Sequence, residues 1–206
     1  MPDEQVLGLR ERKKLDTRKA LSDATLELAF EHGLANITRE DIAARAGVSV
    51  RTFNNYFTGK HEALAFRQTE RIQRSLIALR NRPVDEPLWT AITAAILEPL
   101  EVDGAGDHPP TAHQLAVIRE LLEAPETRTA VSKAVSDDWI EAIAARTGTD
   151  AARDLYPRLV VGAIGAIYQA ATATYVYADP PVLLTTLLRQ AIDEVAAGLP
   201  APSVDD

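Results

Sequence analysis

Apolar residues recur every three to four positions along most of the chain, which is the spacing of one buried face of an α-helix. No segment alternates apolar and polar residues over the length of a strand, and no Asn-Gly or Asp-Gly turn joins two such segments. The pattern predicts an all-α fold of about nine helices. Their expected ranges are 17–32, 38–46, 50–57, 60–80, 89–100, 111–124, 126–147, 151–178 and 181–198.

Prolines and a long uncharged segment refine this prediction. We expect a kink or restart at Pro157, and Pro181 in the first turn of the last helix. The segment 159–178 has no charged residue and is about long enough to span a bilayer. It is rich in Ala and contains Gln169 and two glycines, which favours a buried or subunit-facing helix over a membrane span.

The segment 38–57 has the pattern of a helix-turn-helix. Thr38 with Asp41 three positions later is a capping pattern that begins the first short helix. Gly47 permits the backbone conformation of the turn, and Ser49 is a suitable N-cap for the second short helix. Two short helices joined in this way are typical of a DNA-reading motif.

The second short helix has two unlike faces. At 100° per residue, Phe53, Tyr56 and Phe57 lie on one side, and Arg51 and Asn55 lie opposite. Thr52 and Asn54 flank the polar side. Arg pairs with guanine edges and Asn with adenine edges in the major groove, and Val50 or the Thr52 methyl could contact a thymine methyl. The alternative is an ordinary solvated surface helix.

Charge is distributed unevenly along the chain. The net charge is −8, but residues 1–80 carry 14 Lys and Arg against 11 Asp and Glu, whereas residues 81–206 carry 8 against 19. The N-terminal part can therefore approach a phosphate backbone while the rest is repelled from it. The segment from Arg10 to Lys14, with Arg18 and Lys19, is the most basic stretch. It could lie along phosphates or in the minor groove, or it could be a solubilising tail.

The motif from Thr38 to Ser49, followed by Arg51-Thr52-Phe53 and by Tyr56-Phe57 with Lys60, resembles the TetR family of bacterial regulators. The resemblance covers roughly residues 17–64. It implies an all-α homodimer with an N-terminal three-helix DNA-binding head and a C-terminal body for ligand binding and dimerisation. Most members of the family are repressors released by a small molecule. The resemblance therefore implies double-stranded operator DNA and an effector as partners.

The resemblance also assigns residues to DNA contacts. Thr38 and Arg39 would lie near the backbone, and Tyr56 and Lys60 would hold phosphates. The residues that would face base edges are Val50, Arg51, Thr52 and Asn55. The whole expected DNA-binding set is Thr38, Arg39, Ser49, Val50, Arg51, Thr52, Asn54, Asn55, Tyr56 and Lys60.

Two departures from the family pattern and one finer resemblance concern specificity. Asn54 stands where the family usually has an aromatic residue, so it could read a base, and His61 stands where an acidic residue is usual. The stretch 121–127 and Trp139 are similar to the branch of mycofactocin regulators. That branch implies acyl-CoA or other lipid-derived effectors.

These features predict four parts of the chain: a basic arm at 1–16, the helix-turn-helix domain at 17–64, the ligand-binding and dimerisation domain at 65–198, and a flexible tail at 199–206. A helix-turn-helix reads one half-site, so we expect a dimer. The expected interface residues are Gly162, Gly165, Ala166, Leu184, Leu187, Leu188 and Ile192. The alternative is that these faces pack only within one subunit. The expected ligand contacts are Trp89, Arg119, Trp139, Tyr168, Gln169 and Tyr175.

Other function classes fit the sequence less well. Cysteine is absent and no His pair has the spacing of metal ligands on a helix, so we expect no enzyme, metal site or cofactor. The lack of cysteine and of an apolar segment in residues 1–19 favours a cytoplasmic protein without a membrane partner. A helical adaptor that does not bind DNA would also explain the acidic body, but not the polar outward face beside a basic arm.

Overall fold

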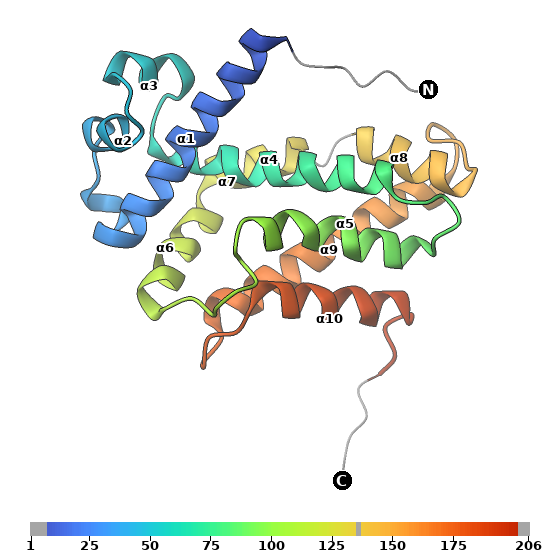
Figure 1. The fold of residues 1–206 in the computed structure, drawn as a ribbon. Coiled ribbons are helices and arrows are strands. Elements are labelled where there is room, and N and C mark those ends of the chain that lie inside the picture. The colour runs from blue at the N-terminus through green and yellow to red at the C-terminus, as the bar shows by residue number, and fades with distance from the viewer. Residues whose placement is uncertain (1–7, 135–136, 202–206) are drawn as a thin grey trace. The chain divides into compact units, whose positions relative to one another are not determined.

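The computed structural model describes residues 8–134 and 137–201. Within these residues the chain forms α-helices and one short 3-10 helix, η1, and no strand (Figure 1). The elements are α1 (Leu9–His32), η1 (Leu34–Asn36), α2 (Arg39–Arg45), α3 (Val50–Tyr56), α4 (Lys60–Asn81), α5 (Leu88–Val102), α6 (Ala112–Glu123), α7 (Pro125–Ala134), α8 (Asp137–Thr147), α9 (Leu155–Tyr177) and α10 (Leu184–Ala196). The predicted all-α fold class is confirmed.

The chain divides into two compact units. The first unit runs to Gln68 and also takes in Val117–Ala130, and the second contains Thr69–Ala116 and the residues from Val131 onward. Helix α4 therefore begins in the first unit and ends in the second. The boundary expected at residues 64 and 65 lies inside this helix.

The first unit packs α1, α2 and α3 around a small apolar core. Leu21 and Ile42 are fully buried, and Phe53 from α3 is 0% exposed. Val117 and Leu121 of α6 join the same cluster. Because these positions fall on one face of each helix, burial of that face holds the three N-terminal helices together.

The second unit is a helical bundle in which α9 packs against α10 and α8, and α10 also packs against α5. Its core contains the predicted apolar stripes, including Ile92, Ile96, Ile143 and Ile167. Helix α9 is long and apolar enough to cross a membrane by length and composition. One face of α9, from Pro157 to Val176, is nevertheless buried in this bundle, as the sequence predicted for a core helix.

Several predicted boundaries are wrong. Helix α1 begins at Leu9 rather than at residue 17, so residues 9–16 of the expected arm are helical. The helix expected at 126–147 is two helices, α7 and α8. The helix expected at 151–178 begins at Leu155, and Pro157 lies in its first turn, where a proline removes no helical hydrogen bond. Of the two expectations for Pro157, the structure therefore fits the restart and not the kink. Pro181 precedes α10 instead of lying within its first turn.

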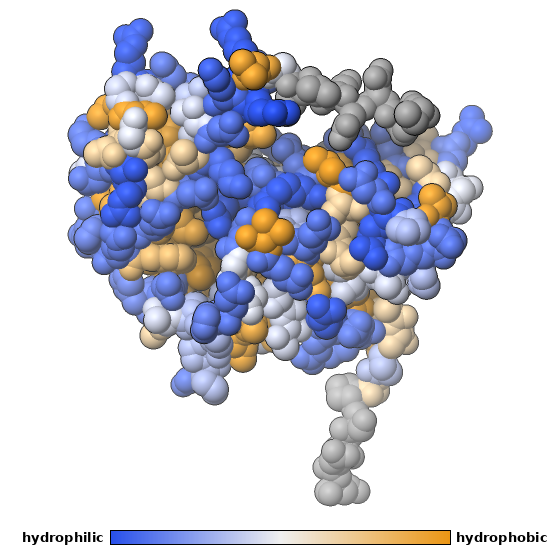
Figure 2. Space-filling view, viewed as in Figure 1, coloured by the Kyte–Doolittle hydropathy of each residue, from blue (hydrophilic) through white to orange (hydrophobic). Residues whose placement is uncertain are grey.

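Most of the surface in view is hydrophilic. Figure 2 shows apolar residues on the side turned to the viewer only as small separate groups among polar ones. Scattered apolar side chains of this kind are ordinary on protein surfaces.

Part of the tail expected at 199–206 lies beyond the described residues.

Candidate nucleic-acid interface

Helix α2, the turn after it and α3 are held by local hydrogen bonds. The Thr38 hydroxyl accepts from the Asp41 amide at 3.2 Å, and the Asp41 carboxylate accepts from the Thr38 amide at 2.9 Å. These hydrogen bonds to Thr38 hold the pKa of Asp41 below its ordinary value. Gly47 has a φ of +67° in the turn, and the Ser49 hydroxyl accepts from the Thr52 amide at 3.1 Å. The predicted capping box and N-cap are therefore confirmed.

An ion pair fixes α2 to α1. The Arg45 guanidinium donates to Glu31 at 2.6 Å and 3.0 Å and to Glu27 at 3.3 Å. The bidentate hydrogen bond with Arg45 holds the pKa of Glu31 below its ordinary value. Such paired contacts fix the angle between two helices better than a single contact does.

Helix α3 places its apolar residues underneath and its polar residues outside. Phe53 and Phe57 are buried, with their ring centroids 6.0 Å apart. Arg51 and Asn55 are exposed on the opposite side. Neither side chain has a hydrogen-bond partner among the residues described, so both are free to reach another molecule.

Arg39 and Asn54 contact each other across the motif. Arg39 donates from Nη1 to Asn54 Oδ1 at 3.2 Å and from Nη2 to the Thr58 carbonyl at 2.6 Å. Both side chains remain exposed. Asn54, which replaces the aromatic residue usual in the family, thus helps to position the end of α3 relative to α2.

Lys60 has a different environment from the one expected. Its ammonium group donates to the carbonyls of Leu34 at 2.6 Å, Ile37 at 3.2 Å and Ala35 at 3.4 Å. A lysine has three N–H donors, so these contacts use all of them. Lys60 thereby fastens the connection between α1 and α2 to the start of α4. Its phosphate contact stays a prediction, and making that contact would require Lys60 to give up some of these hydrogen bonds.

Arg18 is also turned inward. Its guanidinium carbon lies 4.5 Å from the ring centroid of Phe66 and 5.3 Å from that of Phe57. This stacking on two aromatic faces makes Arg18 part of the first unit's packing. It is therefore set apart from the exposed basic residues that precede it on α1.

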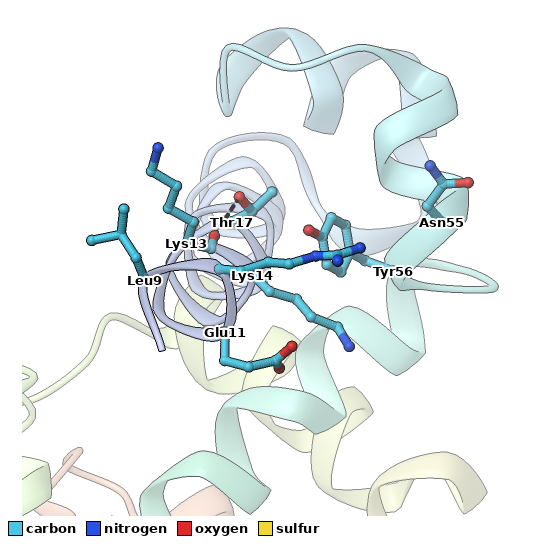
Figure 3. Close-up of a pocket in the computed structure, with 8 residues that line it drawn as sticks. Leu9, Glu11, Lys13, Lys14, Thr17, Asn55 and Tyr56 are labelled. Carbon is cyan, nitrogen blue, oxygen red and sulfur yellow. Dashed lines mark hydrogen bonds between the residues drawn. The ribbon is translucent and has the colours of Figure 1, made fainter. Parts of the chain in front are cut away.

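The first two turns of α1 and the end of α3 border an open hollow of about 780 Å³ (Figure 3). Its lining residues are Leu9, Arg10, Glu11, Lys13, Lys14, Thr17, Asn55 and Tyr56. The sequence predicted the basic residues, but not that α1 would carry them beside Asn55 and Tyr56. The signal available was the high helix propensity of residues 9–16.

The expected ligand contacts do not all gather in one place. Trp89, Trp139 and Tyr168 belong to the same apolar cluster of the second unit. Tyr175 is buried in that unit outside the cluster, whereas Gln169 is exposed. Arg119 belongs to the first unit.

Two side chains of this body have unusual environments. Burial raises the pKa of the Tyr168 hydroxyl to about 12, although the positive charge of Arg71 opposes the shift. The Trp139 indole N–H is buried and finds no acceptor in the described part of the chain. A buried donor of this kind is uncommon in proteins.

The expected dimer residues separate into three groups by exposure. Gly162, Gly165 and Ala166 are exposed on α9. Leu188 and Ile192 are 0% exposed and lie in the core of the second unit, so their side chains are not available to a partner chain. Leu184 and Leu187 are half-buried against the same core.

Comparisons with known proteins agree with the motif. Residues 21–65 match the family model described as bacterial regulatory proteins, tetR family, and residues 86–200 match the model of the MftR C-terminal domain. The second match covers more than half of the chain.

Relatives and solved structures match over nearly the whole length. A protein of Mycobacterium tuberculosis, provisionally named the mycofactocin biosynthesis transcriptional regulator MftR, is 28% identical and covers 97% of this chain and 98% of its own. The HTH-type transcriptional regulator TcmR of Streptomyces glaucescens is 29% identical, and the match covers 91% of this chain and 86% of TcmR. Thermus thermophilus FadR, a TetR family repressor solved with lauroyl-CoA, has a TM-score of 0.57 at 18% identity. The match covers 92% of this chain and 98% of the FadR chain. The chain belongs to the TetR family of bacterial transcriptional regulators and is not an enzyme.

Proposed function

We propose that this DNA-binding transcriptional regulator is a cytoplasmic repressor that binds a palindromic operator as a homodimer and is released by a small apolar or lipid-like effector. The observation that carries the proposal is the exposed polar side of α3. Arg51 and Asn55 point away from a buried aromatic underside and are not used by other contacts in the described residues. Arginine and asparagine are the side chains best suited to reading guanine and adenine edges.

The homodimer follows from the requirement for two half-sites and from the outer face of α9. Leu155 is 67% exposed, Leu159 is 58% exposed and Tyr177 is 65% exposed. Gly162 and Ala166 lie between them on the same face. Small residues flanked by large apolar ones allow two helices to approach closely, and a two-fold axis through this face would pair it with itself.

The effector class rests on the interior of the second unit. Trp89, Trp139 and Tyr168 provide aromatic surface, and the unpaired Trp139 N–H could donate to a polar atom of a ligand. Thermus thermophilus FadR binds lauroyl-CoA in its crystal structure. Together these observations support an effector with an acyl chain.

The test of DNA reading is selection of duplexes from a random pool, followed by anisotropy titration of the selected operator. We expect a sequence with two-fold symmetry. Arg51→Ala should weaken operator binding by about 1–3 kcal/mol and relax the preference at one base position in each half-site. Its binding to random duplex should change much less. Selection of no sequence by folded, dimeric protein would favour the adaptor alternative.

The effector is tested by adding acyl-CoA thioesters of increasing chain length to the preformed complex with the operator. Release that depends on chain length supports the proposal, with free CoA as the control. Trp139 provides an intrinsic fluorescence signal for binding in the absence of DNA. A complex that persists at saturating thioester would exclude this effector class.

A further inference from the structure

We propose that the first two turns of α1 and the end of α3 form a cradle for the sugar–phosphate backbone of duplex DNA, with Arg10 and Lys14 as its phosphate ligands. This inference rests on the proposed function and extends it to a second surface of the first unit. The cradle is the open hollow of about 780 Å³ described above.

The two basic residues continue the inward face of α1. On a helical wheel, Arg10, Lys14 and Thr17 fall within a sector of about 60° that also contains the buried Leu21. The face that packs against the first unit thus changes from apolar to basic where α1 extends beyond the core. Figure 3 shows Lys14 extending toward the side on which Asn55 and Tyr56 lie, whereas Lys13 points away.

The α3 side of the hollow contributes polar groups. The Tyr56 hydroxyl has no hydrogen-bond partner in residues 8–134 and 137–201 and could donate to a phosphate oxygen. Asn55 lines the hollow and also belongs to the exposed side of α3. Because one residue borders both surfaces, a duplex read by α3 would bring its backbone to the hollow, which is too large for a single phosphate group alone.

The charges of this part of α1 oppose its own stability. Residues 9–16 are all exposed, so no tertiary packing supports them. Arg10 and Lys14 are like charges four positions apart, and Arg10 lies in the first turn of α1, where the helix dipole disfavours cations. Neither has an ion-pair partner among the described residues. Residues that conflict with local stability in this way indicate a binding role.

Among the described residues, Glu11 is the one carboxylate that lines the hollow. It lies at the margin of the basic sector and would repel a phosphate. Its presence predicts that Glu11→Gln should strengthen DNA binding at low salt, which is the opposite of the effect of removing Arg10 or Lys14.

The experiment compares two double variants with the same change of charge. Arg10→Ala with Lys14→Ala removes the inward pair, and Arg12→Ala with Lys19→Ala removes two basic residues on the opposite side of α1. Operator affinity is measured from 50 to 300 mM salt, where each lost phosphate contact lowers the slope of log K against log salt by about 0.9. We expect removal of the inward pair to lower the slope by nearly two for each head. Removal of the outward pair should leave the slope unchanged.

Further readouts separate the possible outcomes. The inward variant should melt at the same temperature as the wild type or higher, and should lose the same slope on random duplex. Equal effects of the two double variants would overturn the cradle in favour of general electrostatic attraction. If the inward variant loses affinity only for operators with A·T-rich flanks, the cradle would be overturned in favour of minor-groove reading. Failure of the wild type to bind any duplex would instead overturn the proposed function.

Discussion

At the level of one residue, Lys60 raises the question of whether a role known from the family applies to the same motif position in this chain. Its three hydrogen bonds to the carbonyls of Leu34, Ala35 and Ile37 predict a structural role. Lys60→Met should destabilise the first unit by about 2 kcal/mol, because hydrogen bonds from a charged donor contribute that much. Hydrogen exchange of the α1 and α2 amides measures this, and the salt slope of DNA binding should stay at the wild-type value. A reduced slope with unchanged exchange would restore the phosphate role.

The direction of a side chain was the part of the site that the sequence predicted least well. The outward side of α3 follows from helical geometry, since Phe53 and Phe57 fix which side is buried. The positions of Lys60 and Arg18 depend instead on long-range contacts, with carbonyls of η1 and with the rings of Phe57 and Phe66. The spacing of apolar residues along a helix carries no information about contacts with residues far away in the sequence.

At the level of an element, the capping box of α2 makes the first unit sensitive to acid. Hydrogen bonds from Thr38 lower the pKa of Asp41 in the folded chain, so its contribution is present at neutral pH and is lost as the pH falls through the folded pKa. Asp41→Asn should therefore be less stable than the wild type at pH 7, and the difference should shrink toward pH 3. Urea unfolding at each pH measures the difference.

The matched control is Glu40→Gln, which removes a neighbouring first-turn carboxylate that has no role in the cap. It changes the same charge near the same helix terminus. If Glu40→Gln shows the same pH dependence, the helix dipole rather than the capping box is responsible.

Element boundaries were predicted where a cap or a glycine marks them, as at Thr38, Gly47 and Ser49. They were missed where exposed residues continue a helix. Residues 9–16 form helix by propensity and show no apolar stripe, so a prediction based on buried faces begins α1 too late. The division between α7 and α8 lacks a glycine or proline at residues 134–137. The signal that the prediction missed is Ser136 followed by two aspartates, the sequence pattern of an N-cap and an acidic first turn.

For the whole molecule, the outer face of α9 is the proposed dimer interface, which would allow two heads to act together. Ala166→Glu places a carboxylate at an exposed small residue of that face, and Ala145→Glu makes the same change at an exposed position of α8. We expect Ala166→Glu to be monomeric by sedimentation at micromolar concentration and Ala145→Glu to remain dimeric.

Loss of the second head should weaken operator binding by about 10²-fold or more, because the two half-sites are no longer bound by one particle. Binding to an isolated half-site should be the same for both variants, since neither substitution lies in the first unit. A dimeric Ala166→Glu variant would place the interface elsewhere. A monomeric variant with full operator affinity would show that one head is sufficient.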